Sequence, residues 1–200
     1  IMRILPQYIF PIVFLACSVC GCSTATDAGV PERADSAAWR QRHAAEVGWP
    51  NWMGPNHDGV SREKGWSSNW PEDGLPVVWS REIGIGFSSV SIVDGKLYTM
   101  GHTDGKEFVY CLHVDTGQTI WRHSYDGEFV DYLHEGGPGT TPTVDGDFVF
   151  TLGRAGQLYC LDKANGEVVW QKELQDDLGV SLPEWGFTSS PYVLGNRIIL

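Results

Sequence analysis

The sequence repeats itself at a spacing of 49 residues. Tyr110-Cys111-Leu112 recurs as Tyr159-Cys160-Leu161, and further residues match at the same offset. These further pairs are Gly117 with Gly166, Trp121 with Trp170, Pro142 with Pro191, and Gly146 with Gly195. Independent matches at one offset indicate a tandem structural repeat, so the chain is expected to fold as stacked copies of one supersecondary unit.

Each copy divides into four short segments separated by turns. Asp94-Gly95 and Asp145-Gly146 are strong two-residue hairpin signals, and Asp115-Thr116-Gly117 turns the chain before the fourth segment. The predicted strands of the two complete copies are 88–93, 96–101, 108–114, 119–122, 141–144, 148–152, 157–161 and 168–172. A third copy begins at Thr188. Four-stranded units at this period are typical of propeller blades, so we predict an all-β β-propeller with about two complete blades and parts of others.

Each copy ends in a Gly-x-x-x-Trp element, formed by Gly117 and Trp121 and again by Gly166 and Trp170. Glycine permits the positive φ of the turn before the outer strand. The indole four residues later lies on a blade face, where its large area can pack between neighbouring blades. We therefore expect these tryptophans to be core residues rather than cofactor ligands.

Cys111 and Cys160 occupy equivalent strand positions flanked by apolar residues. An exported protein can form disulfides. Equivalent positions in adjacent blades are expected to lie farther apart than the roughly 4.4–6.8 Å Cα separation that a disulfide requires. We predict two buried free thiols.

Residues 1–22 predict a lipoprotein signal peptide. Arg3 follows the expected start at Met2, and the apolar stretch over 8–16 is shorter than the roughly 20 residues of a membrane span. Val19-Cys20-Gly21-Cys22 resembles the bacterial lipobox, which implies diacylation of Cys22. An ordinary cleaved signal peptide with incidental cysteines is the alternative.

The residues after the lipobox predict a tether. Ser23 directly after the cysteine resembles the outer-membrane sorting pattern, which implies a lipoprotein on the periplasmic side of the outer membrane. Residues 23–47 lack a period-2 apolar pattern and are expected to be a flexible linker. The folded part is expected over 48–200.

Charge and residue spacing exclude several classes of function. The net charge of −11, with no cluster of Lys and Arg, argues against binding of nucleic acid. The histidines are scattered without metal-ligand spacing, and no nucleophile, histidine and carboxylate form a recognisable catalytic triad.

Two blocks carry a family resemblance. Asp115-Thr116-Gly117-Gln118-Thr119-Ile120-Trp121 and residues 161–170 resemble the tryptophan-docking motif of PQQ-like β-propeller repeats, and the opening over 49–60 resembles exported bacterial members. The resemblance covers roughly residues 49–200. His113 departs from the motif, because the equivalent residue of the next repeat is the aspartate Asp162.

The resemblance implies a closed ring of seven or eight blades, so this chain is expected to be part of a longer protein. It also implies that missing strands complete the blade of an outer strand over 76–83, which includes Trp79. Long connectors over about 122–141 and 171–190 are expected to ring the mouth of the central channel. These connectors hold Glu135, Glu184 and Trp185.

Three functions are compatible with these features. The favoured hypothesis is a non-catalytic scaffold that binds envelope proteins and is held at the membrane by its lipid anchor, similar to the scaffold lipoprotein of the outer-membrane β-barrel assembly machinery. The alternative is a quinoprotein alcohol or sugar dehydrogenase, in which Glu135, Glu184 and Trp185 would help hold the cofactor PQQ and its Ca²⁺. A role in handling sugars or polymers, through Trp185 or the Trp49 and Trp52 pair, is the third.

Overall fold

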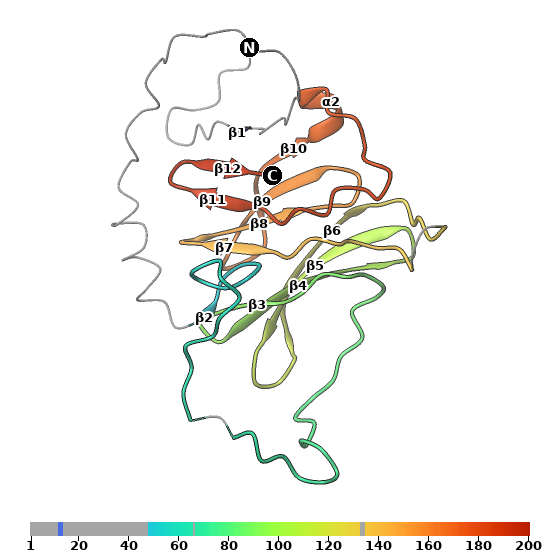
Figure 1. Cartoon of the computed structure of the whole chain (residues 1–200). Helices are drawn as coiled ribbons and strands as arrows, with labels where there is room; N and C mark the ends of the chain where they lie inside the picture. The colour runs from blue at the N-terminus through green and yellow to red at the C-terminus, as the bar shows by residue number, and fades with distance from the viewer. Residues whose placement is uncertain (1–11, 14–47, 66, 133–134) are drawn as a thin grey trace, which may run out of the picture.

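The chain forms three sheets that lie side by side and fan outward from their first strands (Figure 1). The computed structural model describes residues 12–13, 48–65, 67–132 and 135–200. The predicted signal peptide and tether, including Cys22, lie outside the described residues except for Ile12–Val13. None of the helices among the described residues has the length and apolar character needed to cross a membrane.

The first and second sheets are antiparallel blades with neighbouring strands in chain order. The first contains β2 (Gly48–Trp49), β3 (Ser91–Val93), β4 (Lys96–Thr103), β5 (Lys106–His113) and β6 (Thr119–Asp126). The second contains β7 (Thr143–Asp145), β8 (Phe148–Leu152), β9 (Gln157–Asp162) and β10 (Val168–Glu173). The third contains β11 (Tyr192–Leu194), β12 (Arg197–Ile199) and the parallel strand β1 (Ile12–Val13). This arrangement confirms the predicted all-β fold: the second sheet has four strands, and the first has the four predicted strands with β2 added beside β3.

The hairpin between β4 and β5 extends beyond its predicted end. β4 continues to Thr103 and turns at Asp104 and Gly105, which have φ values of 51° and 74°. β6 continues to Asp126 because it pairs with β5 along its full length, down to Lys106 opposite Asp126.

The inner strands are shorter than predicted because their first residues bind the next blade. The Ser89 N–H donates to Thr141 Oγ1 at 3.3 Å, and the Thr141 N–H donates to Ser190 Oγ at 2.8 Å. In the opposite sense, the Ser91 and Thr143 hydroxyls donate to the Pro142 and Pro191 carbonyls. These repeated contacts join β3, β7 and β11 around the axis of the fan.

Two local predictions need correction. Residues 76–83 were expected to form an outer strand, but they lie outside the strands. A strand needs a neighbour to accept its backbone hydrogen bonds, and no described strand pairs with this segment. The sequence analysis also did not anticipate α2 (Leu174–Leu178), which ends at Gly179 with φ of 66° and buries Leu174.

Trp79 and Trp121 each pack on the glycine of the following Gly-x-x-x-Trp element. Trp79 Nε1 donates to the Val114 carbonyl at 2.8 Å, and its ring covers Gly117. Trp121 Nε1 donates to the Lys163 carbonyl at 3.0 Å, and its ring covers Gly166. Trp121 belongs to the buried core between the first two blades, as predicted, and Trp170 is half-buried against a cluster that joins the second and third sheets.

The core between the first two blades is made of apolar side chains from both facing sheets. Its buried members are Val93, Tyr98, Met100, Val109, Cys111, Trp121, Tyr125, Val144, Val149, Tyr159 and Leu161. Cys111 and Cys160 are both buried and free, as predicted. Burial raises the pKa of the Cys111 thiol to about 11 and that of Cys160 to about 12, so both stay protonated and unreactive at neutral pH.

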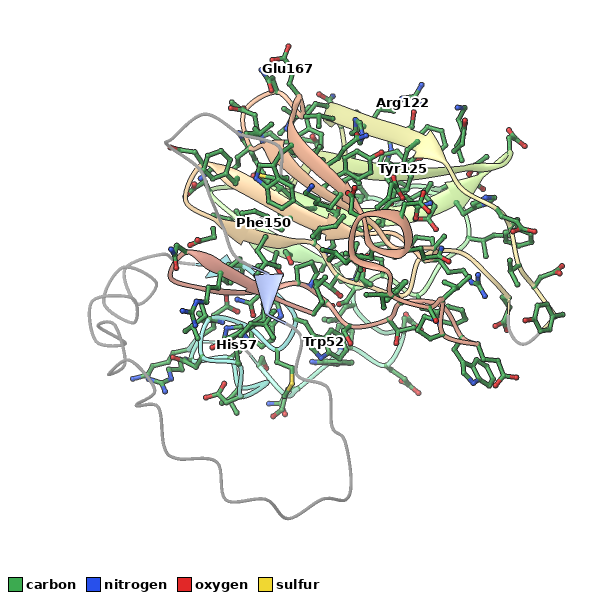
Figure 2. The ribbon with its side chains drawn as sticks, turned by 90° about the horizontal axis from the view of Figure 1, so that it is seen from above. Trp52, His57, Arg122, Tyr125, Phe150 and Glu167 are labelled. Carbon is green, nitrogen blue, oxygen red and sulfur yellow. The ribbon has the colours of Figure 1, made fainter. Side chains whose placement is uncertain are left out.

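The segment over 48–60 covers the end of the blades at which β3 and β7 turn into the strands that follow them. The Val144 N–H donates to the Pro50 carbonyl at 2.7 Å, and the His57 ring contacts Tyr192 at 4.5 Å between centroids. Figure 2 shows Trp52 and His57 on this segment, away from Arg122 and Glu167 at the outer rim. Trp52, Met53 and Val60 are exposed on this segment.

Candidate functional site

The end of the blades opposite that segment is formed by connectors, which lie at the right of Figure 1. We call this surface the connector face; it comprises residues 84–87, 127–132, 135–142, 153–156 and 179–191. Rigid strands hold these loops in place: Ile85 pairs with His102 at the end of β4, and the Phe87 N–H donates to the Pro138 carbonyl at 2.8 Å.

A pocket of about 310 Å³ opens on the connector face. It lies where the segments that precede β3, β7 and β11 converge, beside the hairpin between β8 and β9. The lining residues are Phe87, Gly137, Gly139, Arg154, Trp185, Phe187 and Thr188. All three blades thus contribute to one cavity, although its residues span a hundred positions of sequence.

Arg154 lines this cavity and is held there by the neighbouring connector. The Phe187 N–H donates to the Arg154 carbonyl at 2.9 Å, which ties the hairpin to the connector. Gly186, with φ of 75°, crosses directly over the Arg154 side chain, where a Cβ atom would stand 2.5 Å from Arg154 Cγ. The arginine stem is therefore clamped, and only 6% of the residue is exposed.

The charge of Arg154 has no ion-pair partner among the described residues. Its Nε atom is buried and makes no hydrogen bond to any of the described residues. A guanidinium group keeps its charge at all accessible pH values. Burial of such a group without a partner is costly, so this arginine is the most unusual electrostatic feature of the pocket.

Glu107 lies close to Arg154, and each of its carboxylate oxygens accepts a hydrogen bond. Its Oε1 accepts the Arg154 backbone N–H at 3.2 Å, and its Oε2 accepts the Tyr125 hydroxyl at 2.8 Å. Burial raises the pKa of this carboxyl above its ordinary value, against the opposing effects of the Tyr125 bond and of the Arg154 charge. Tyr125 and Glu107 are both buried, and Figure 2 shows Tyr125 among the strands.

Comparison with known proteins identifies the repeats. The family model described as outer membrane protein assembly factor BamB matches residues 105–200. Residues 105–200 carry PQQ-like β-propeller repeats. No curated protein matches this sequence.

A solved structure shares the fold of these PQQ-like repeats, and a second is similar over part of the chain. The crystal structure of quinohemoprotein alcohol dehydrogenase from Comamonas testosteroni is similar with a TM-score of 0.57 and 21% identity, over 83% of this chain and 26% of that one. BamB from Moraxella catarrhalis matches with a TM-score of 0.36 and 18% identity, over 55% of this chain and 28% of that one. The chain thus spans about a quarter of each of these proteins.

Of the three residues predicted for a cofactor site, Trp185 is the one that lines the pocket. Trp185 lines the pocket and is 53% exposed. Glu135 and Glu184 are exposed on the two connectors and do not line the pocket. No three His, Cys, Asp or Glu side chains of the described residues gather closely enough to hold a metal ion. Ca²⁺ takes six to eight oxygen ligands, more than any group of His, Cys, Asp and Glu side chains among the described residues brings together.

The sequence analysis missed Arg154 and Glu107. At the repeat offset Arg154 corresponds to Gly105, so comparison of the copies marks it as a residue that blade packing does not require. Glu107, in contrast, stands in an apolar strand next to Phe108. A charged residue in a predicted buried strand is a signal that a polar partner must lie nearby.

Proposed function

We propose that this chain is the PQQ-like β-propeller part of a non-catalytic scaffold that binds other proteins of the cell envelope through its connector face. The observation that carries this proposal is a group of exposed apolar side chains around the pocket. Ile85, Phe87, Phe129 and Trp185 are exposed by 47%, 55%, 38% and 53%. Large apolar groups exposed together on a rigid surface are typical of protein interaction sites.

These four exposed side chains form one continuous apolar surface. Phe87 and Trp185 line the same cavity. Ile85 pairs with His102, and the Phe129 ring lies 4.9 Å from the His102 ring between centroids. The apolar surface therefore continues from the pocket across the first blade to the connector that follows β6.

The cell-envelope setting extends this proposal. Diacylation at Cys22 would hold the protein on the periplasmic side of the outer membrane, with residues 23–47 as the tether. The family description as an outer membrane protein assembly factor supports this setting. We expect labelled palmitate to be incorporated into the full-length protein and to be lost in Cys22→Ser; equal labelling of the variant would remove the anchor from the proposal.

Site-specific photo-crosslinking tests the binding surface. A photoreactive residue placed at Phe129 or Trp185 of the full-length protein in cells should give discrete adducts. The matched control is Glu167, an exposed residue in the turn before β10 at the outer rim (Figure 2). Adducts from the connector positions alone are expected; similar adducts from all three positions, or none, would contradict the proposal.

The dehydrogenase alternative keeps one specific observation in its favour. Trp185 lies in the pocket beside Arg154, and an indole with a cation suits a planar anionic quinone. The whole protein supplied with PQQ and Ca²⁺ should then reduce a redox dye with an alcohol or sugar. Quinone-dependent turnover would replace the scaffold proposal with this alternative, whereas its absence together with connector-face adducts supports the scaffold.

A further inference from the structure

We propose that the Arg154 pocket captures an acidic side chain of a partner polypeptide, and that the surrounding apolar surface holds the apolar residues beside it. This inference rests on the proposed scaffold function and names the chemistry of the partner. It begins from Arg154, which is clamped, nearly buried and without an ion-pair partner among the described residues.

The arrangement around Arg154 favours an external carboxylate. Glu107 makes no ion pair with the guanidinium among the described residues; its two oxygens accept the Arg154 backbone N–H and the Tyr125 hydroxyl. Its raised pKa also reduces the negative charge that it carries at mildly acidic pH. A carboxylate that enters the pocket would form a charge-assisted hydrogen bond with the guanidinium, which is among the strongest polar contacts in proteins.

The size and walls of the pocket favour a side chain over a large ligand. Its volume of about 310 Å³ lies at the lower end of the roughly 300–1,000 Å³ range of small-molecule sites. Phe87, Trp185 and Phe187 form apolar walls around the single charged group. Such walls exclude water and thereby strengthen the contact between arginine and carboxylate.

The exposed surface beside the pocket indicates that the occupant extends beyond it. Ile85 and Phe129 are exposed outside the cavity, so an isolated small anion would leave them uncovered. A peptide with apolar residues next to its acidic residue would cover both. The chain itself carries a net charge of −11, so long-range attraction does not bring an acidic partner in, and recognition must depend on this short-range contact.

Peptide binding provides the test. The probe is a fluorescently labelled peptide in which one glutamate is flanked by leucine and phenylalanine, and its twin carries glutamine in place of glutamate. Fluorescence anisotropy with the full-length protein should show about tenfold or greater preference for the glutamate peptide. Failure to bind either peptide, or equal affinity for both, overturns the inference.

Two variants locate the effect. Arg154→Met keeps the stem that packs under Gly186 but removes the charge, so it should bind both peptides equally. Arg154→Lys keeps a charge and should retain part of the preference, which separates loss of charge from loss of folding. Arg122→Met is the matched control, because Arg122 is an exposed arginine on the outer strand β6; it should behave as the unchanged protein. A preference that persists in Arg154→Met would assign the carboxylate to another site.

The outcomes also separate this inference from the scaffold proposal. Connector-face adducts that form equally in the Arg154→Met protein would leave the scaffold intact and refute the acidic-partner inference. Absence of both adducts and glutamate-dependent binding would refute the two together. Displacement of the peptide by PQQ, with quinone-dependent dye reduction, would assign the pocket to a cofactor and overturn the inference.

Discussion

Two glycines of the second blade have similar backbone conformations but different surroundings. Gly146 and Gly166 have φ values of 58° and 76°. A Cβ atom on Gly146 would meet nothing within 4 Å, whereas on Gly166 it would stand 2.5 Å from Trp121 Cε3. Glycine at position 166 is thus required both by the turn and by the indole that packs on it.

This contrast predicts different costs for the same substitution. Gly146→Ala should lower the free energy of unfolding by about 1 kcal/mol, the cost of a left-handed conformation for a residue with a Cβ. Gly166→Ala should lower it by about 2–4 kcal/mol, because displacement of Trp121 adds to that cost. Urea unfolding of the full-length protein measures both; equal losses would show that the tryptophan contact contributes nothing.

Glu107 predicts a particular dependence of stability on pH. Burial raises its pKa in the folded protein, so the folded state binds this proton more tightly than the unfolded chain does. The resulting stabilisation is fully present below the unfolded pKa of about 4.3 and is lost as pH rises through the folded pKa.

The variant Glu107→Gln tests this dependence. It carries no titrating proton, so its free energy of unfolding relative to the unchanged protein should increase as pH rises above about 4.3. Urea unfolding at a series of pH values gives the difference directly. Parallel curves for the two proteins would show that the carboxyl does not titrate differently on folding.

At the scale of elements, the turns before the two outer strands differ in how they satisfy their backbone. Asp162 Oδ1 accepts the Ala164 and Asn165 N–H groups at 2.8 and 3.2 Å. In the first blade His113 Nδ1 accepts only the Asp115 N–H, at 3.3 Å. The first repeat therefore lacks this stabilising carboxylate, and the imidazole of His113 is a weaker replacement.

Substitutions of Asp162 and His113 should change the free energy of unfolding in opposite directions. Asp162→Ala removes both accepted bonds and should lower the free energy of unfolding by about 1–2 kcal/mol. His113→Asp should raise it by about 0.5–1 kcal/mol, because a carboxylate accepts turn N–H groups better than imidazole does. Thermal unfolding monitored by circular dichroism measures both; destabilisation by His113→Asp would show that the neighbouring acidic residues outweigh the turn.

The elements also show which structural features a sequence can predict. The eight strands and their turns follow from hairpin signals and from the repeat, because both are local or periodic. The segment over 76–83 resembles an outer strand in its residues. Strand formation also needs a partner strand, and none of the described strands pairs with this segment. The same dependence explains why Ser89 and Thr141 contact the next blade instead of extending β3 and β7.

At the scale of the whole molecule, the pocket forms where connections from the three sheets meet. Phe87, Arg154 and Trp185 come from three separate connections, and no spacing along the sequence predicts that they meet. Sequence analysis placed Trp185 and two glutamates at the channel mouth; the structure brings the tryptophan into the pocket and leaves both carboxylates exposed on the surface. The contact of each glutamate with a cofactor stays a prediction for the whole ring.

The central claim is that the connector face is the binding surface, and the affinity for a partner identified by crosslinking tests it most directly. Trp185→Ser removes an exposed connector-face indole, and Val168→Ser is the control, because Val168 is exposed by 42% on the outer strand β10. Calorimetric titration should show affinity about tenfold lower or more for Trp185→Ser and unchanged for Val168→Ser. Equal affinities of the two variants would contradict the account.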